Sequence, residues 1–239
     1  MMKKSSSISF KNPENNKLII CGIDEAGRGP VFGPMIICGV CFYDNQIESL
    51  KAIGVKDSKK LTPEKRKQLA IIIKQNALKL KIAEISAEEI DQREQKKITL
   101  NQLEELYMAN IINDLTPDEI YIDAADVNEQ RFKKSIKMGL NYKPKKIIAK
   151  HKADIIYPVV SASSIIAKDL RDSIIDELKG KYGNFGSGYP SDAKTIESLR
   201  NWIIEHKKIP PFVRKSWQTT KNILNKELKN KKITEFTNQ

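Results

Sequence analysis

Short apolar runs recur along the first two thirds of the chain, and each predicts one strand of a sheet. The runs at 18–21 and 35–42 are separated by a segment rich in glycine and proline, which predicts a hairpin-like pair of strands. Alternating apolar and charged residues predict a third strand over 80–85. Two further runs, at 119–123 and 146–150, predict two more strands.

Helical patterns lie between the later strands. Thr62, Pro63 and Glu64 form the start signal of a helix that runs to about residue 77. Further helices are predicted for a short segment from residue 86, for 100–115, 128–138, 161–181 and 192–206, and after residue 217. Strands that first follow one another and then alternate with helices predict an α/β fold with a mixed sheet, antiparallel at first and then joined by crossovers.

The sequence changes character after Tyr182, where a loop rich in turn residues precedes a basic end. From 214 to 232 the chain has seven bases and one acid, Glu227. We therefore expect a flexible N-terminal extension over 1–17, a main domain over 18–182, and a helical basic appendage over 183–239 with a frayed end.

The net charge of +12 favours a polyanionic partner, nucleic acid before an anionic membrane surface. The basic N-terminus lacks the apolar segment of a signal peptide, and no run of 18 apolar residues exists. We expect a cytoplasmic protein that makes no membrane contact.

Three cysteines, Cys21, Cys38 and Cys41, are too few for a disulfide framework. Cys38 and Cys41 have the spacing of a zinc-binding pair, but they lie in an apolar run, and the two histidines, His151 and His206, are distant in sequence. Buried, reduced cysteines are the expectation.

The candidate chemistry begins with Asp24 and Glu25, which we expect where the first strand gives way to a turn. Adjacent carboxylates repel one another unless a cation lies between them. Mg²⁺ is typically held by one or two carboxylates together with phosphate oxygens. The alternative is an exposed acidic turn without a ligand.

Acids also follow two later strands. Asp123 closes the strand at 119–123, and Asp154 follows the strand at 146–150. Ligand sites in wound α/β sheets form beyond the carboxyl ends of strands, so neighbouring strands would bring four carboxylates together. Four carboxylates suit two divalent ions that promote in-line displacement at a phosphate. Asp126 competes with Asp123 for the third position, but its place before a helix favours a role near the helix dipole.

Gly27-Arg28-Gly29 directly follows the acidic pair. The segment lacks the spacing of a phosphate-binding P-loop. Its two glycines permit close backbone approach to a ligand, and free amides can recognise a hydroxyl. The alternative is a simple turn.

Six motifs in this order resemble ribonuclease HII, most closely its archaeal-type members, over about residues 18–222. They are 24–30 with Gly33-Pro34, the triplet 57–59, and the segments 123–128, 151–154, 157–168 and 186–192. The resemblance implies a ribonuclease H-like, mixed five-stranded sheet with a catalytic domain over 18–182 and a substrate-binding appendage over 183–239.

The resemblance also implies the reaction. The enzyme would hydrolyse the RNA strand of RNA–DNA hybrids and cut on the 5′ side of ribonucleotides embedded in duplex DNA, leaving 3′-hydroxyl and 5′-phosphate ends. Primer removal and excision of ribonucleotides from DNA would be its roles. It would act as a monomer, and a sliding clamp is a further candidate partner that no residue pattern supports.

Residue roles carry over motif by motif. The catalytic and metal-binding acids would be Asp24, Glu25, Asp123 and Asp154, holding two Mn²⁺ or Mg²⁺ ions when substrate is bound. The groups that recognise the ribose 2′-hydroxyl would be Gly27, Arg28 and Gly29. Tyr189 would contact the sugar of the adjoining deoxynucleotide, and Lys59 a backbone phosphate.

A duplex substrate also needs a cationic surface, which makes binding depend strongly on salt. Arg214 and Lys215 are candidates for phosphate contacts, against the alternative of a merely solvated basic face. Trp217 is expected to anchor the last helix to the core rather than stack on a base.

Two other function classes compete with a metal-dependent ribonuclease. A non-catalytic hybrid- or duplex-binding protein would bind through the basic appendage without metal-dependent turnover. A DNA-directed nuclease or strand-transfer enzyme would cut all-DNA duplex, which recognition of a 2′-hydroxyl would forbid.

Overall fold

The computed structural model describes residues 17–55 and 61–237 of the chain, with side chains described as far as residue 227. The chain forms two compact units that are interleaved in sequence. The first unit contains the residues up to 26, with 36–83 and 104–170, and the second contains 27–35, 84–103 and 171–239. The predicted domain ranges 1–17, 18–182 and 183–239 stay a prediction.

One mixed sheet of five strands, in the order β3-β2-β1-β4-β5, forms the centre of the first unit. Its strands are β1 (Ile19–Ala26), β2 (Met35–Tyr43), β3 (Lys79–Ile85), β4 (Glu119–Asp123) and β5 (Lys146–Lys150). The β1 strand pairs antiparallel with β2 and parallel with β4, and β4 pairs parallel with β5. The predicted mixed sheet, antiparallel first and then wound, is confirmed.

The helices follow the predicted order with three additions. The described helices are α1 (Ile47–Ala52), α2 (Pro63–Asn76), α3 (Ala87–Gln92), α4 (Leu100–Leu115), α5 (Glu129–Met138), α6 (Ala153–Ile156), α7 (Pro158–Tyr182), α8 (Ala193–His206) and α9 (Gln218–Thr237), with a 3₁₀ turn η1 (Asp44–Gln46). The sequence reading missed η1, α1 and α6. The α7 helix begins at Pro158 and not at 161, because proline suits the first helical position.

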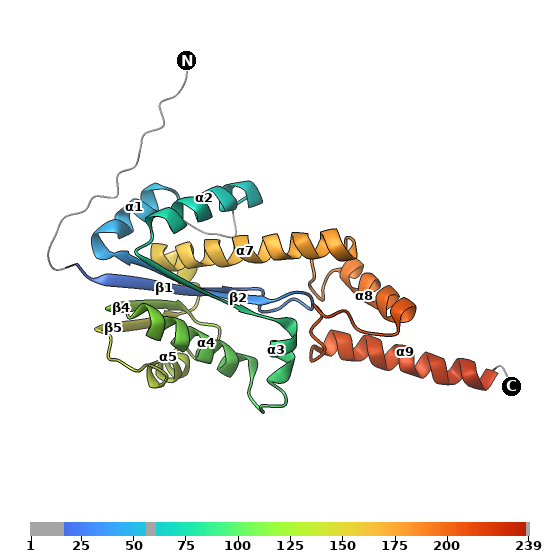
Figure 1. The fold of residues 1–239 in the computed structure, drawn as a ribbon. Coiled ribbons are helices and arrows are strands. Elements are labelled where there is room, and N and C mark those ends of the chain that lie inside the picture. Colours follow the sequence, from blue (N-terminus) through green and yellow to red (C-terminus); the bar gives the residue numbers. More distant parts are fainter. Residues whose placement is uncertain (1–16, 56–60, 238–239) are drawn as a thin grey trace, which may run out of the picture. The chain divides into compact units, whose positions relative to one another are not determined.

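Helices cover both faces of this sheet, with α2 and α7 over one face and α4 and α5 over the other (Figure 1). A Cβ atom at Gly22 would lie 2.2 Å from the Val159 carbonyl oxygen, so α7 packs directly on the β1 backbone. The Ser163 hydroxyl donates a 2.6 Å hydrogen bond to the Gly22 carbonyl at the same place. On the other face, a Cβ at Gly39 would lie 2.5 Å from Ile111 of α4. This close packing fixes β1 two residues before Asp24.

The second unit has its own apolar core. Its buried members are Val31, Phe32, Ile175, Phe185, Leu199, Ile203 and Val213. The Phe32 ring meets the rings of Phe185 and Phe212 edge-on, at centroid distances of 4.9 Å and 5.5 Å. Trp217 packs against this core, as predicted. The segment that follows β1 is therefore anchored by aromatic packing within the second unit.

The three cysteines are buried free thiols, as predicted. Burial raises the pKa of Cys21 and of Cys38 well above the usual thiol range. None of the helices in the described ranges combines the length and the apolar character needed to cross a membrane.

Candidate functional site

Three aspartates of the first unit lie together. Among the described residues, Asp24, Asp123 and Asp154 each offer a carboxylate oxygen within 4.8 Å of the other two. Asp24 comes from β1, Asp123 is the last residue of β4, and Asp154 lies on α6, just after β5. Of the acids that the sequence singled out, the structure brings these three into one group.

The sheet register explains this convergence. Ile23 pairs with Ile122 across the parallel strands β1 and β4, so the residues that follow, Asp24 within β1 and Asp123 at the end of β4, lie side by side. After β5 the chain turns sharply through Lys152, which has a left-handed φ of 57°. The next amide, that of Ala153, donates a 3.0 Å hydrogen bond to the Asp123 carboxylate. The turn therefore ties the start of α6, and with it Asp154, to the end of β4.

Burial makes this cluster electrostatically demanding. Asp24 is 3% exposed and Asp154 is 2% exposed. Burial raises the pKa of Asp24 well above its usual range, and the charges of Glu25 and Asp123 raise it further. A hydrogen bond from Ser164 and the charge of Lys168 lower that pKa and offset part of the rise. The carboxylates repel one another in a place where water screens poorly.

Glu25 does not join this group. The expectation of a turn at Asp24 and Glu25 is wrong, because β1 continues through Ala26 and the turn begins at Gly27. Successive side chains of a strand point to opposite faces, so Asp24 and Glu25 diverge. Glu25 still acts on Asp24 through its charge, and its role as a metal ligand stays a prediction.

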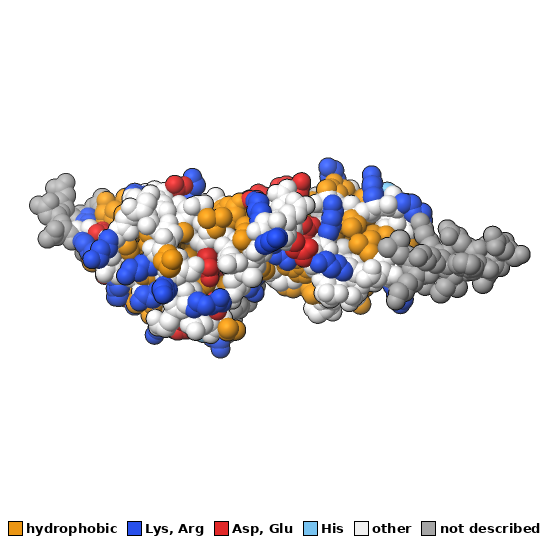
Figure 2. All heavy atoms as spheres, turned by 90° about the horizontal axis from the view of Figure 1, so that it is seen from below, with side chains coloured by type: hydrophobic (Ala, Val, Ile, Leu, Met, Phe, Trp, Pro, Cys, Tyr) orange, Lys and Arg blue, Asp and Glu red, His pale blue; other side chains and the backbone are white. Residues whose placement is uncertain are grey.

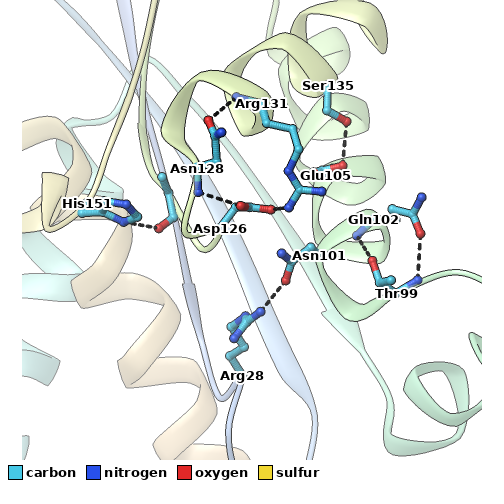
Figure 3. Close-up of polar contacts among 11 residues, drawn as sticks. Arg28, Thr99, Asn101, Gln102, Glu105, Asp126, Asn128, Arg131, Ser135 and His151 are labelled. Carbon is cyan, nitrogen blue, oxygen red and sulfur yellow. Dashed lines mark hydrogen bonds and ion pairs between the residues drawn. The ribbon is translucent and has the colours of Figure 1, made fainter.

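Asp126, the competitor of Asp123, lies outside the cluster. Its buried carboxylate accepts a 2.8 Å hydrogen bond from the Asn128 amide and forms an ion pair with Arg131 (Figure 3). Asn128 in turn caps α5 by accepting a hydrogen bond from the Arg131 amide. Asp126 therefore organises the start of α5, as the position before a helix suggested.

The donor set of the cluster fits a divalent cation. Carboxylate oxygens are the ligands that Mg²⁺ and Mn²⁺ prefer. Two of the three carboxylates are buried beside a third, and bound positive charge would offset both the burial and the repulsion that raise the pKa of Asp24. Asp24, Asp123 and Asp154 are the residues that would hold such an ion.

The glycine-arginine loop (residues 27–33) belongs to the second unit. Gly27 has a left-handed φ of 85°, and a Cβ there would lie 2.2 Å from Nε of Arg171, so only glycine fits. The Arg28 side chain extends to the Asn101 carboxamide at the start of α4 (Figure 3). At Gly29 a Cβ would come no closer than 3.8 Å, to the Tyr189 ring.

Tyr189 lies beside this loop in the second unit. The Gly188 carbonyl accepts hydrogen bonds from the amides of Val31, at 2.8 Å, and Phe32, at 3.3 Å. Tyr189 is 42% exposed, and the Arg171 guanidinium lies 5.9 Å from its ring centroid. The structure thus brings two predicted substrate contacts together, the glycine-arginine loop and an accessible aromatic ring.

Asp192 closes the turn that carries Tyr189. Its carboxylate accepts hydrogen bonds from the amides of Ser187, at 2.6 Å, and Lys194, at 3.0 Å. These bonds, the one from Ser187 first, lower the pKa of Asp192 to about 2.

The expected phosphate contact at Arg214 is wrong. Its side chain is fully buried, and the guanidinium donates hydrogen bonds to three main-chain carbonyl groups. Lys215 is exposed and stays a candidate. Lys59, the other predicted phosphate contact, lies outside the described residues.

Part of the basic character of the appendage is neutralised internally. Lys221 pairs with Glu94 at 2.9 Å, and Arg200 pairs with Glu227 at 2.8 Å. In the first unit, Lys and Arg side chains gather on the face seen from below (Figure 2). The α5–β5 region, which the sequence reading did not single out, contributes exposed lysines at 134, 137, 143, 145, 146 and 150. Two of them are in ion pairs, Lys145 with Asp118 and Lys146 with Glu119.

Sequence reasoning missed three residues at these sites. From α7, Ser164 donates a hydrogen bond to Asp24 and Lys168 acts on Asp24 through its charge, and their four-residue spacing on a helix was the available signal. Arg214 holds the glycine-arginine loop from a position far along the chain, and no local pattern announces that contact.

Comparison with known proteins places the chain in a family. The model of the family "Ribonuclease HII" matches residues 21–220. Ribonuclease HII of Pyrococcus furiosus is 51% identical over 206 residues, which are 85% of this chain and 90% of that protein.

Two solved structures share the fold. The ribonuclease H2 of Pyrococcus horikoshii OT3 superposes with a TM-score of 0.83 at 43% identity, over 87% of this chain and 98% of that one. The ribonuclease HII in a complex with PCNA from Archaeoglobus fulgidus gives a TM-score of 0.77 at 40% identity, over 85% and 96% of the two chains. The predicted ribonuclease H-like fold is confirmed, and the chain belongs to the ribonuclease HII family of metal-dependent ribonucleases H.

Proposed function

We propose that this enzyme hydrolyses the RNA strand of RNA–DNA hybrids and cuts on the 5′ side of a ribonucleotide embedded in duplex DNA. The observation that carries the proposal is the group of three carboxylates, Asp24, Asp123 and Asp154, within 4.8 Å of one another in the first unit. Such a donor set suits hydrolysis of a phosphodiester, where charge develops on the attacking and leaving oxygens.

The acids would hold two Mg²⁺ or Mn²⁺ ions once substrate supplies further oxygen ligands, with Glu25 as the fourth acid. Ions held by these acids would supply an activated water and charge stabilisation at the leaving oxygen, and hydrolysis of that kind would leave 3′-hydroxyl and 5′-phosphate ends. The protein's part is to hold Asp24 in place, through the hydrogen bond from Ser164 and the packing of α7 on β1.

The glycine-arginine loop would recognise the ribose. Its amides can donate to a 2′-hydroxyl, the group that distinguishes RNA from DNA. Tyr189, exposed beside Gly29 in the second unit, would contact the sugar of the next nucleotide, and Lys59 would meet a phosphate. This division of labour supports roles in primer removal and ribonucleotide excision.

The partners follow from the same reading. We propose a monomer acting on hybrid or ribonucleotide-containing duplex, without a membrane. The ribonuclease HII of Archaeoglobus fulgidus is known in a complex with PCNA, which supports a sliding clamp as a partner here.

The test uses a labelled DNA duplex with one ribonucleotide and an all-DNA duplex of the same sequence, each with Mg²⁺, Mn²⁺ or EDTA. We expect cutting on the 5′ side of the ribonucleotide in either metal, an intact all-DNA duplex, and no cutting in EDTA. Binding without cutting, or equal cutting of both duplexes, would overturn the proposed function.

A further inference from the structure

We propose that Arg214 is a positioning residue, which orients the amide groups of the glycine-arginine loop that recognise the ribose. Trp217 assists Arg214 in this role. The inference rests on the proposed function of that loop, because it names the groups that give the loop its shape. All the contacts concerned lie within the second unit.

One guanidinium holds three carbonyl groups of the loop. Nη2 of Arg214 donates to the Gly27 carbonyl at 2.6 Å, Nη1 to the Arg28 carbonyl at 2.9 Å, and Nε to the Gly33 carbonyl at 3.1 Å. The rigid planar fork of arginine suits such a set of acceptors, and the single ammonium of lysine does not.

Neighbouring groups hold three other carbonyls of the loop. Nε1 of Trp217 donates to the Gly29 carbonyl at 3.1 Å, and the Arg214 amide donates to the Val31 carbonyl at 2.9 Å. Nη2 of Arg171 donates to the Phe32 carbonyl at 3.2 Å. Arg214, Trp217 and Arg171 thus satisfy every carbonyl of the loop except that of Pro30.

The geometry of the peptide unit links the direction of each held carbonyl group to the direction of the next amide N–H donor. In a planar trans peptide, the carbonyl of one residue and the amide N–H of the next point in opposite directions. Drawing the Gly27 and Arg28 carbonyls toward Arg214 therefore directs the N–H groups of Arg28 and Gly29 away from it. These are two of the amides that the proposed function assigns to the 2′-hydroxyl.

The buried charge of Arg214 is expensive in this position. The side chain has no exposure, and its hydrogen bonds to the loop go to neutral carbonyls rather than to carboxylates. Burial and the nearby charge of Arg171 lower the pKa of Arg214 to about 9. An apolar side chain would avoid the cost of desolvating a cation. The Trp217 ring, 4.8 Å from the guanidinium, and the charge of Asp91 offset part of that cost. The three loop carbonyls offset a further part, and in doing so they are held in place by the guanidinium.

The experiment measures the affinities of the full chain for two duplexes in EDTA, where neither is cut. One duplex is all DNA, and the other differs from it by a single ribonucleotide. The ratio of the two dissociation constants therefore measures how strongly one 2′-hydroxyl group is recognised. The variants are Arg214→Ala, Arg214→Lys and Trp217→Phe. Arg200→Ala is the control, because it removes an arginine of the same unit that pairs with Glu227 and not with the loop.

We expect the wild type to prefer the ribonucleotide duplex, and Arg214→Ala to lose about tenfold of that preference, the scale of one or two hydrogen bonds. Its affinity for all-DNA duplex should stay within about twofold, because only the reading amides have moved. Arg214→Lys keeps the positive charge and should lose as much of the preference as Arg214→Ala. Free guanidinium at a non-denaturing concentration should restore part of the preference in Arg214→Ala and in no other variant. Arg200→Ala should keep the wild-type ratio.

Trp217→Phe keeps an aromatic ring and removes one hydrogen-bond donor to the loop. It therefore tests the orientation of the loop by side-chain donors even if Arg214→Ala does not fold, as judged by the lack of a cooperative thermal transition. A preference unchanged in Arg214→Lys and in Trp217→Phe would overturn the inference alone. Equal loss of affinity for both duplexes would also overturn it, because that is the mark of a merely structural role. A wild type without any preference would instead overturn the proposed function of the loop, and the inference with it.

Discussion

The two units of this chain hold their functional groups by opposite electrostatics. In the first unit, three carboxylates lie close to one another, and burial first and the neighbouring negative charges second raise the pKa of Asp24. In the second unit, a buried cation is surrounded by carbonyl oxygens that it attracts. The first arrangement is strained until positive charge arrives, whereas the second is satisfied in the free protein. A cation site can remain electrostatically unfavourable until the cation binds. A site that recognises a hydroxyl group needs its amide donors preorganised before the substrate binds.

The largest expected effect lies in the acid cluster. Asp24→Asn or Asp154→Asn should lower cleavage of the ribonucleotide-containing duplex by more than about 100-fold, beyond the loss typical for residues that only support a metal ligand. Single-turnover rates in Mg²⁺ and Mn²⁺ provide the measurement. Asp126→Asn is the matched control, since Asp126 is a buried aspartate near the same strand end whose partners are Asn128 and Arg131. It should keep most of the activity, and equal losses in all three variants would refute the assignment.

Two glycines of the loop should behave differently. Gly27→Ala should destabilise the fold by about 1–3 kcal/mol, because it needs a left-handed φ and places Cβ against Arg171. A Cβ at position 29 would meet only ordinary contact distances among the described residues. Gly29→Ala should therefore unfold at a temperature close to that of the wild type, while its recognition of the ribose is weakened. Thermal unfolding beside cleavage assays separates the two effects. Equal destabilisation by both changes would contradict the described loop geometry.

Removing one charge from the acid cluster should stabilise the metal-free protein. In EDTA at pH 7 we expect Asp24→Asn to raise Tm by a few degrees, since about 1 kcal/mol corresponds to about 2–4 °C at this size. A carboxyl group whose pKa is raised by folding contributes stability below its unfolded pKa of about 4, and that contribution is lost as the pH rises through the folded value. The gain in Tm should therefore shrink toward pH 4.

Bound metal provides the control for this prediction. Mg²⁺ or Mn²⁺ should raise the Tm of the wild type more than that of Asp24→Asn, because binding stabilises only a folded state that holds the ion. An Asp24→Asn protein that melts below the wild type in EDTA would show that the cluster is not strained.

The smallest effect concerns the basic surfaces. Joint replacement of Lys134 and Lys137 by alanine should weaken binding of any duplex and reduce the salt slope by about one for each phosphate that these lysines neutralise. Lys221→Ala should change the slope little, because that ammonium pairs with Glu94. Titrations at several salt concentrations would decide, and a larger change in Lys221→Ala would favour the basic appendage as the main duplex contact.

The contrast between the two units also explains which parts of the site could be predicted from the sequence. The triad of aspartates follows from strand ends in a wound sheet, so local patterns and chain order predicted it. The divergence of Glu25 could not be foreseen, because it depends on β1 running to Ala26, five residues beyond the predicted run at 18–21. Arg214 looked like a phosphate contact, since sequence shows the charge of a residue but not its burial. Only folding brings it to carbonyls nearly two hundred positions earlier in the chain.

We expect cleavage and ribose recognition to depend on separate sets of residues. This expectation is tested most directly by the binding of Asp24→Asn in Mg²⁺ to the ribonucleotide-containing duplex and to its all-DNA counterpart. We expect no cleavage, together with a preference for the ribonucleotide equal to that of the wild type in EDTA. If the variant lost both cleavage and the preference, the expectation would be contradicted, because Asp24 would then serve recognition as well as chemistry.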